Sequence, residues 1–372
     1  MQRVSGGTVC AAGSRLLRRR GLAVAVVSLF ASCGPLAASA FGGVANAGIP
    51  GAPSNNPLAG LPWGIYTGPI DGVWPAYAAA RGTQRRLLAR IALRPSVYWF
   101  GPWNPDNAAR GVARGFIDNV TRGKDSVLSQ IAVFRVDPWE NAACTALPSA
   151  AAQASYKQWI DGFAAGIGES RVALILQPDL PFALCVPQHS VLPLRLVAYA
   201  AKVFNALPHT TVYIDVGAAD WVNVRQATWL LRQAGVRYAR GFALNDTHYD
   251  STGNELAFGA RVSQALAAAH IRGRHFVINT AENGAPFLYY KYHGNIKNPP
   301  PCASRFAHSC PTLGIPPTWR VSDRRWHLSR RARAIARRLA DAYLWAGRPW
   351  LDYGAGPFDL NFALGLARST PF

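Results

Sequence analysis

Short apolar runs alternate with longer amphipathic segments along most of the chain. A continuous apolar run is typical of a strand buried on both faces, and apolar positions at three- and four-residue spacing are typical of helices. Strands are predicted at residues 96–100, 130–136, 172–176, 211–215, 240–244, 275–279 and 350–352. Helices are predicted at residues 84–93, 151–166, 188–206, 222–235, 254–270 and 327–345. This repeated order predicts an α/β fold, a distorted TIM-like barrel of seven or eight parallel strands joined by right-handed crossovers.

The first forty residues have the pattern of an export signal. A basic segment at 15–20 precedes an apolar segment at 21–30, and small residues at 38–40 or 45–47 offer cleavage sites. We expect residues 1–40 to be a signal peptide and the protein to be secreted or associated with the cell envelope. The paired arginines and Cys33 leave twin-arginine and lipoprotein routes open.

Composition divides the remaining chain into two parts. Residues 41–60 are rich in Gly, Ala, Pro and Asn, which predicts a linker or an N-terminal arm. Residues 61–372 carry the alternating strands and helices, and we expect them to form the barrel domain.

Four cysteines remain after the predicted signal peptide, and an even number in an exported chain indicates two disulfide bonds. They are Cys144, Cys185, Cys302 and Cys310. Of the three pairings that four cysteines allow, we favour 144–185 and 302–310, because each pair flanks a loop at the expected site. Zinc is the competing interpretation, but no histidine lies at ligand spacing to these cysteines. We expect no metal and no organic cofactor.

The chain is strongly basic. Its formal charge is +20, and removing the five arginines of residues 1–40 leaves 34 basic minus 19 acidic residues, or +15. Eight arginines fall within residues 320–338, where their spacing predicts an amphipathic helix with a solvated polar face. Nucleic-acid binding is not expected, because no recognisable module accompanies the charge. A solvated face is the favoured interpretation of this charge; if the charge has a partner, an anionic cell-envelope surface is the one we expect, and we expect a monomer.

Polar and acidic residues follow the predicted strands at the point where each strand ends. They are Asp137, Asp179, Asp215, Asn245 with Asp246, Asn279 with Glu282, and Asp352. Barrel geometry brings the ends of all strands to one rim, where catalytic residues gather. Helix capping is the alternative role for each of them. Asp179, between two prolines at the end of an apolar run, is expected to have the raised pKa that a general acid needs.

Tryptophans share that predicted rim. The chain has twelve, more than a core of this size requires. Those near strand ends are Trp63, Trp99, Trp103, Trp139, Trp221, Trp319, Trp345 and Trp350. Exposed indoles beside carboxylates form stacking platforms for sugar rings, although core burial is the alternative role for any one of them. Paired carboxylates and aromatic platforms in an exported barrel favour glycoside hydrolysis.

Several segments, in the right order, resemble glycoside hydrolase family 6, which contains endoglucanases and cellobiohydrolases. The resemblance extends from about Asn56 to Asp352. Leu174–Asp179 resembles the family's apolar–Glu-Pro-Asp motif, which holds the general acid. The other similar segments are Val212–Trp221, Gly241–Asn245, Ile278–Gly284, Leu313–Thr318 and Tyr156–Ile167. The resemblance implies hydrolysis of β-1,4-glucan or a related polysaccharide, with inversion, by paired carboxylates.

The sequence departs from the family pattern around the general acid. The family's Arg-Asp-Cys element supplies a second Asp that modulates the pKa of the acid, and no Asp stands beside Cys144 here. The family's Lys-x-Pro-Gly-Glu-x-Asp-Gly loop, which holds its proposed base, appears as residues 347–354. Replaced positions are Gln177 for Glu, Ala218 for His and Glu282 for Arg.

These patterns give each candidate residue a role. Asp179 is expected to protonate the departing glycosidic oxygen, Asp352 to be the base through water, and Asp137 or Glu140 to tune the acid. Candidates for sugar binding are Trp63, Trp221, Asn245, Asp215, Glu282 and Trp345. An inverting enzyme would hold its acid and base carboxyls roughly 6.5–9.5 Å apart. The rival hypothesis is a catalytically inactive barrel that binds wall polysaccharide, which the missing Asp favours.

Overall fold

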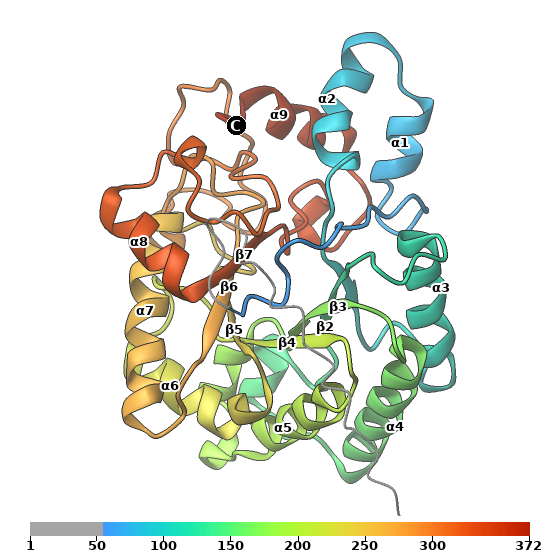
Figure 1. Cartoon of the computed structure of the whole chain (residues 1–372), viewed down its shortest axis with the longest axis vertical. Helices are drawn as coiled ribbons and strands as arrows, with labels where there is room; N and C mark the ends of the chain where they lie inside the picture. Colours follow the sequence, from blue (N-terminus) through green and yellow to red (C-terminus); the bar gives the residue numbers. More distant parts are fainter. Residues whose placement is uncertain (1–54) are drawn as a thin grey trace, which may run out of the picture. The chain divides into compact units, whose positions relative to one another are not determined.

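A single parallel sheet organises residues 55–372, which are the residues that the computed structural model describes. The predicted signal peptide (1–40) and most of the predicted arm (41–60) lie outside the described residues. The seven strands of this sheet follow one another in sequence order (Figure 1). They are β1 (Tyr98–Phe100), β2 (Ser129–Val133), β3 (Val172–Leu176), β4 (Thr210–Asp215), β5 (Gly241–Leu244), β6 (His275–Asn279) and β7 (Ala340–Leu344). The predicted α/β class and distorted parallel barrel are confirmed.

Helices connect successive strands, as right-handed crossovers require. The α-helices of the described residues are α1 (Val73–Ala79), α2 (Gly82–Ala92), α3 (Ala109–Thr121), α4 (Ala150–Ile167), α5 (Leu192–Asn205), α6 (Val224–Gln233), α7 (Thr252–Ala268), α8 (Arg330–Leu339) and α9 (Leu360–Ser369). Within residues 55–372, no helix combines the length and apolar character needed to cross a membrane.

On the inner side of the sheet, alanines alternate with larger apolar side chains. Residues of this side include Ala132, Ala173, Ala243 and Ala342, with the larger Tyr213 among them. Leu58, near the end of the predicted arm, is fully buried in the same cluster. The interior is therefore a packed core, as in other small barrels, and residues 55–60 contribute to it.

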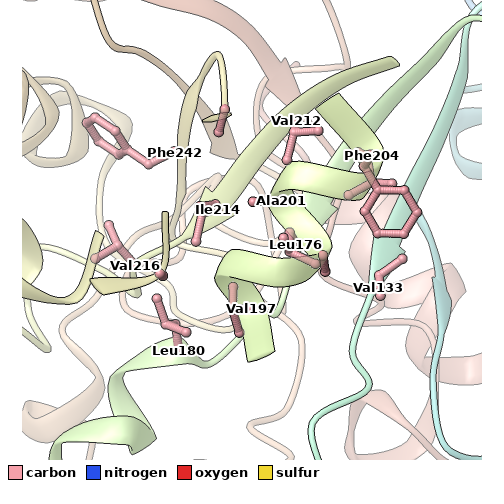
Figure 2. Packing of buried hydrophobic residues seen from close by; sticks show 14 of the residues in the cluster. Val133, Leu176, Leu180, Val197, Ala201, Phe204, Val212, Ile214, Val216 and Phe242 are labelled. Atoms are coloured by element: carbon pink, nitrogen blue, oxygen red, sulfur yellow. The ribbon is translucent and has the colours of Figure 1, made fainter. Parts of the chain in front are cut away.

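The outer side of the sheet packs against the helices. Figure 2 shows Leu176 of β3 and Ile214 of β4 beside Val197 and Ala201 of α5, and all four belong to one fully buried cluster. Each fully buried Leu, Ile or Val stabilises the fold by about 1.5–3 kcal/mol. Because β3 is buried along its whole length, the apolar run at 172–176 has no polar position until the strand ends.

The edge strands β1 and β7 are joined by individual hydrogen bonds outside the sheet ladder. The backbone N–H of Val97 donates to the carbonyl oxygen of Trp345 (2.9 Å). The indole Nε1 of Trp99 donates to the carbonyl oxygen of Ala346 (2.7 Å). These bonds hold the start of the sheet against its end, so the connection after β7 shares the rim with β1.

Two predicted elements near the C-terminal end are wrong. The predicted helix 327–345 ends at Leu339, and residues 340–344 form β7. The predicted strand 350–352 is instead the approach to a 3-10 turn, Asp352–Gly354. Ala340-Asp-Ala-Tyr-Leu344 continues the helical spacing of α8, so only its pairing with β6 makes it a strand. Helices α1, α3 and α9 had no counterpart in the prediction.

Asp341 fixes the position of β7. A register shift in the pairing with β6 falls at this residue. Its carboxylate accepts hydrogen bonds from Arg240 Nε (2.8 Å) and the Tyr213 hydroxyl (2.8 Å). His275 Nδ1 lies 3.1 Å away. Burial alone would raise the pKa of Asp341, but the contacts with His275 and Arg240 outweigh it and hold that pKa below its usual value.

The substitution Asp341→Asn should lower the free energy of unfolding by about 3–5 kcal/mol, because it leaves the guanidinium of Arg240 without its buried partner. Urea denaturation at neutral pH measures this change. The control is Asp118→Asn, which removes the exposed partner of Arg114 and should change stability by no more than about 0.5 kcal/mol. Equal losses in the two variants would contradict the anchoring role of Asp341.

Candidate active site

A cleft with a volume of about 1010 Å³ opens at the carboxyl ends of the strands. Its acidic lining residues come from separate connections: Glu140 follows β2, Asp179 follows β3, Asp246 follows β5 and Glu282 follows β6. This edge is where β/α barrels hold their active sites. The fold therefore brings together carboxyl groups that are far apart in the sequence.

Asp179 occupies an unusual backbone conformation at this rim. Its φ is 64°, in the left-handed region that few non-glycine residues adopt, and such residues concentrate at functional sites. It precedes the 3-10 segment Leu180–Leu184 but makes no side-chain capping bond to it. Instead, Thr247 Oγ1 donates a hydrogen bond to Asp179 Oδ1 (2.7 Å). Burial raises the pKa of Asp179 to about 6, although Thr247 and His248 act to lower it.

Two further carboxyl groups are buried close to Asp179. Asp215 accepts the backbone N–H of Gly217 (2.7 Å) and has no place in the cleft lining, so it lies behind the acid. Asp246 lines the cleft, and neither of its carboxyl oxygens has a hydrogen-bond partner among the described residues. Burial raises the pKa of both groups well above the usual value, and their proximity to each other and to Asp179 adds to the effect.

The loop after β2 presents Glu140 to the cleft, whereas Asp137 lies elsewhere. Glu140 begins a 3-10 segment, Glu140–Cys144, and lines the cleft. After burial, its charge is the other influence that raises the pKa of Asp179. Asp137 is exposed and is not part of the cleft lining. Of the two candidates for tuning the acid, Glu140 has the required position.

Both predicted disulfide bonds are confirmed. Cys144 and Cys185 are joined (S–S 2.02 Å), and so are Cys302 and Cys310 (2.10 Å). The first bond links the segment that carries Glu140 to the segment that follows Asp179, and both of its cysteines line the cleft. This cross-link holds the two carboxyl-bearing loops together.

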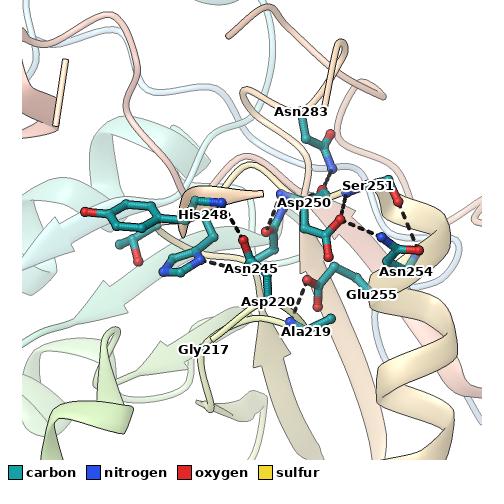
Figure 3. Close-up of polar contacts among 12 residues, drawn as sticks. Gly217, Ala219, Asp220, Asn245, His248, Asp250, Ser251, Asn254, Glu255 and Asn283 are labelled. Carbon is teal, nitrogen blue, oxygen red and sulfur yellow. Dashed lines mark hydrogen bonds and ion pairs between the residues drawn. The ribbon is translucent and has the colours of Figure 1, made fainter. Parts of the chain in front are cut away.

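Aromatic rings form a stack along one wall of the cleft. Trp221 stacks on the ring of His248 (centroids 4.9 Å apart), which stacks on Tyr289 (4.6 Å). Asp220 holds this arrangement, because its carboxylate lies 2.7 Å from His248 Nδ1 and also accepts the backbone N–H of Tyr289 (2.7 Å). Figure 3 shows the contact of His248 with Asp220. The wall offers both apolar faces and polar edges to a ligand.

Asn245 ties loops together behind the cleft. Its side chain donates to the carbonyl oxygens of Asp250 and Asn279 (3.2 Å each) and accepts the backbone N–H of Asp250 (3.2 Å). Figure 3 shows Asn245, Asp250 and Asn283 in this network. Asn245 is fully buried and absent from the cleft lining, so its side chain has no free group for a sugar.

Glu282 faces the cleft, where the charge of the half-buried Arg348 acts on it. Its side chain is 7% exposed, and burial raises its pKa to about 8 against the lowering effect of Arg348. Arg348 also lines the cleft, with its guanidinium 4.5 Å from the ring centroid of Trp99. Burial lowers the pKa of Arg348 to about 10, which leaves it positively charged at neutral pH. The sequence pointed to Glu282 but not to this partner.

Of the remaining predicted site residues, the two tryptophans lie away from the cleft, and Asp352 lies beside it, between the cleft-lining Leu351 and Gly354. Trp63 pairs with Leu128 at the start of β2, at the opposite end of the sheet, and Trp345 is 1% exposed in the core. Asp352 accepts a hydrogen bond from Asn298 Nδ2 (2.9 Å), and its carboxylate is not part of the cleft lining. No contact with a ligand in the cleft is available to either tryptophan, which corrects the roles expected for them, whereas the role expected for Asp352 stays a prediction.

Several cleft residues had no role in the sequence prediction. Thr247 and His248 follow the noted strand end at Asn245, and Arg348 precedes a proline in the loop compared with the family's base. Their residue types carried no signal, because Thr and His are common in loops and arginine is abundant in this chain. Only the contacts with Asp179 and Glu282 distinguish them.

A parallel barrel with a shielded carboxyl of raised pKa and an aromatic wall in one cleft has the architecture of the glycoside hydrolases. The chain belongs to the glycosyl hydrolases family 6, whose family model matches residues 66–324. The resemblance found in the sequence is thereby confirmed.

Named relatives agree with this assignment. Endoglucanase A of Cellulomonas fimi is 34% identical over 224 residues, which are 59% of this chain and 47% of that protein. Endoglucanase 1 of Streptomyces halstedii is 30% identical over 231 residues, 59% of this chain and 69% of that one. The matched part thus spans about half the length of the Cellulomonas relative.

Solved structures share the fold. An endoglucanase from Mycobacterium tuberculosis, in complex with methyl-cellobiosyl-4-deoxy-4-thio-β-D-cellobioside, superposes with a TM-score of 0.64 at 27% identity, over 84% of this chain and 98% of that one. The catalytic core of a cellobiohydrolase from Chaetomium thermophilum matches the fold with a TM-score of 0.59 at 18% identity, over 84% and 98% of the two chains.

Replacing Thr247 with valine should raise the pKa of Asp179 further above about 6, because the lost hydrogen bond stabilises the ionised carboxylate. Carboxyl-carbon NMR titration of aspartate-labelled protein measures this directly. Thr228→Val, which removes a hydroxyl bonded only to the backbone of α6, is the matched control. An unchanged Asp179 titration in Thr247→Val would show that the bond has no influence.

Proposed function

We propose that this chain is a secreted glycoside hydrolase that cleaves β-1,4-glucan or a related polysaccharide with inversion, and that Asp179 is its general acid. The proposal rests on Asp179, whose carboxyl group lines the cleft. Burial raises the pKa of this group to about 6. Such a group is still largely protonated up to about pH 6, well above the usual range of a carboxyl, and can transfer its proton to a departing oxygen.

The relatives support the choice of substrate. Those matched over more than half of this chain are named endoglucanases, and the structure from Mycobacterium tuberculosis holds a thio-linked cellobioside derivative. The cleft, at about 1010 Å³, has room for several sugar units, and Trp221 and Tyr289 supply aromatic surface for them.

Asp179 and its surroundings would act in sequence. The protonated carboxyl donates to the glycosidic oxygen while Thr247 holds it in place and stabilises the carboxylate that forms. A water molecule attacks the anomeric carbon from the opposite face and loses a proton to a second carboxylate. Glu140 keeps the proton on Asp179 before reaction, because its negative charge opposes ionisation of the acid.

Asp179→Asn should reduce hydrolysis of a β-1,4-glucan by at least about 100-fold, because the amide cannot protonate the leaving oxygen. Reducing-sugar release measures the loss, and proton NMR of the earliest wild-type products should show the α-anomer. Glu169→Gln, an exposed acid beyond α4, is the matched control.

Two outcomes would contradict this function. Polysaccharide binding without turnover in the wild type would favour the inactive wall-binding barrel. Early products in the β configuration would exclude inversion.

The basic surface around α8 suits an anionic polymer of the cell envelope. Arginines 330, 331, 337 and 338 are exposed, and among the described residues none of them pairs with an acidic group. Residues 1–40, with the pattern of an export signal, would deliver the protein to such a polymer. Attraction of this kind weakens as salt screens the charges.

Replacing these four arginines with glutamine should weaken binding to long-chain polyphosphate at least tenfold at low salt and leave hydrolysis of soluble oligosaccharides unchanged, because α8 lies outside the cleft lining. Affinity measured at rising salt checks the prediction. Glutamine at arginines 81, 86, 94 and 110 removes the same charge from another exposed surface. Equal weakening by both sets would show a dependence on net charge alone.

A further inference from the structure

We propose that Glu282 is the general base of this enzyme. The inference rests on the proposed function and goes beyond it, because it assigns the second carboxyl of the reaction to a position where the family pattern has arginine. Asp352, the residue expected from the sequence to be the base, is bonded to Asn298 and lies outside the cleft lining.

The position of Glu282 is the first argument. It follows β6 by three residues, as Asp179 follows β3, so both stand on the same rim and line the same cleft. Its side chain is 7% exposed, yet it has no side-chain hydrogen bond within the described residues. Buried polar groups normally have a partner. A carboxylate kept without one, facing a cleft, is free to bind the attacking water.

Gly347 provides the space for this carboxylate. A Cβ atom placed on Gly347 would lie 2.5 Å from Glu282 Oε1, so no larger residue fits there while Glu282 keeps its position. The family pattern has a lysine at the place of Gly347 and an arginine at the place of Glu282. Compared with the family pattern, these two replacements remove a lysine and an arginine and introduce one carboxyl group, that of Glu282, near the cation of Arg348.

The surroundings of Glu282 and Asp179 differ in a way that suits an acid–base pair. The charges acting on Asp179 are those of His248 and Glu140, whereas the charge acting on Glu282 is that of Arg348. The charge of Glu140 raises the pKa of Asp179, and the charge of Asp179 raises the pKa of Asp246, so these three carboxyls form one electrostatic group. Glu282 is a cleft-lining carboxyl that is not among the charges acting on Asp179.

The reaction balances with these two groups. Ionised Glu282 accepts a proton from water as the water oxygen bonds to the anomeric carbon. The bond between that carbon and the glycosidic oxygen breaks, and the leaving oxygen takes the proton of Asp179. The products are the α-hemiacetal, the free alcohol, protonated Glu282 and ionised Asp179, which exchange their proton through solvent.

Leaving-group dependence separates the base from the acid. With cello-oligosaccharides, Glu282→Ala and Asp179→Ala should each lower kcat by about 100- to 10,000-fold. The leaving group of 2,4-dinitrophenyl cellobioside needs no proton. With this substrate, Asp179→Ala should regain most of its lost kcat, and Glu282→Ala should not. Added azide should restore turnover of this substrate by Glu282→Ala and yield the α-glycosyl azide, because the anion needs no base.

The pH profile gives a second readout. Asp179, the acid, has a pKa of about 6 and Glu282, the base, one of about 8, so the reactive form with Asp179 protonated and Glu282 ionised is a minor fraction that is greatest between these two values. Wild-type kcat/KM should therefore fall below pH 6 and above pH 8. The isosteric variant Glu282→Gln should lose the acidic limb, because no base remains to be protonated. Its alkaline limb should move toward pH 6, where Asp179 alone loses its proton. Glu169→Gln should keep the wild-type profile.

Each outcome bears on one proposal. An inactive wild type would overturn the proposed function itself. An active wild type with an active, azide-insensitive Glu282→Ala would overturn only the role of Glu282. If Asp352→Ala lost activity toward the dinitrophenyl substrate and regained it with azide, while Glu282→Ala stayed active, Asp352 would be the general base.

Discussion

Exclusion of water from carboxyl groups at one rim of the barrel is the interaction on which the site depends. Burial is the largest influence on the pKa of Asp179, Asp215, Asp246 and Glu282, and it raises each one. The curled sheet makes this shielding possible, because it places the ends of four strands around one cleft.

Asp179 stands in the segment that resembles the general-acid motif of family 6, and several residues around it differ from the family pattern. Glu140, held by the Cys144–Cys185 bond, occupies a position from which its charge acts on Asp179, although its motif has no aspartate beside the cysteine. Glu282 and Gly347 stand where the family pattern has cations. Different charges therefore act on the two carboxyls: those of His248 and Glu140 on Asp179, and that of Arg348 on Glu282.

Stability and function use carboxyl groups in opposite ways in this barrel. Asp341 is buried but fully paired with Arg240, Tyr213 and His275, so its pKa is held low and its charge anchors β7. Asp246 is buried with no hydrogen-bond partner for either carboxyl oxygen among the described residues, and burial raises the pKa of Asp246 and of Glu282. Pairing decides whether a buried acid holds the fold or remains available for chemistry.

The sequence determined the barrel class, six of the seven strands, both disulfide pairs and the rim position of Asp179, because apolar runs and strand-end residues are local signals. It could not separate β7 from α8, since Ala340–Leu344 fits a helix until β6 pairs with it. Nor could it distinguish the buried Trp345 and Asn245 from the cleft-lining Trp221, or pair Glu282 with Arg348. Those distinctions depend on which loops meet across the rim, and only the tertiary structure sets those distances.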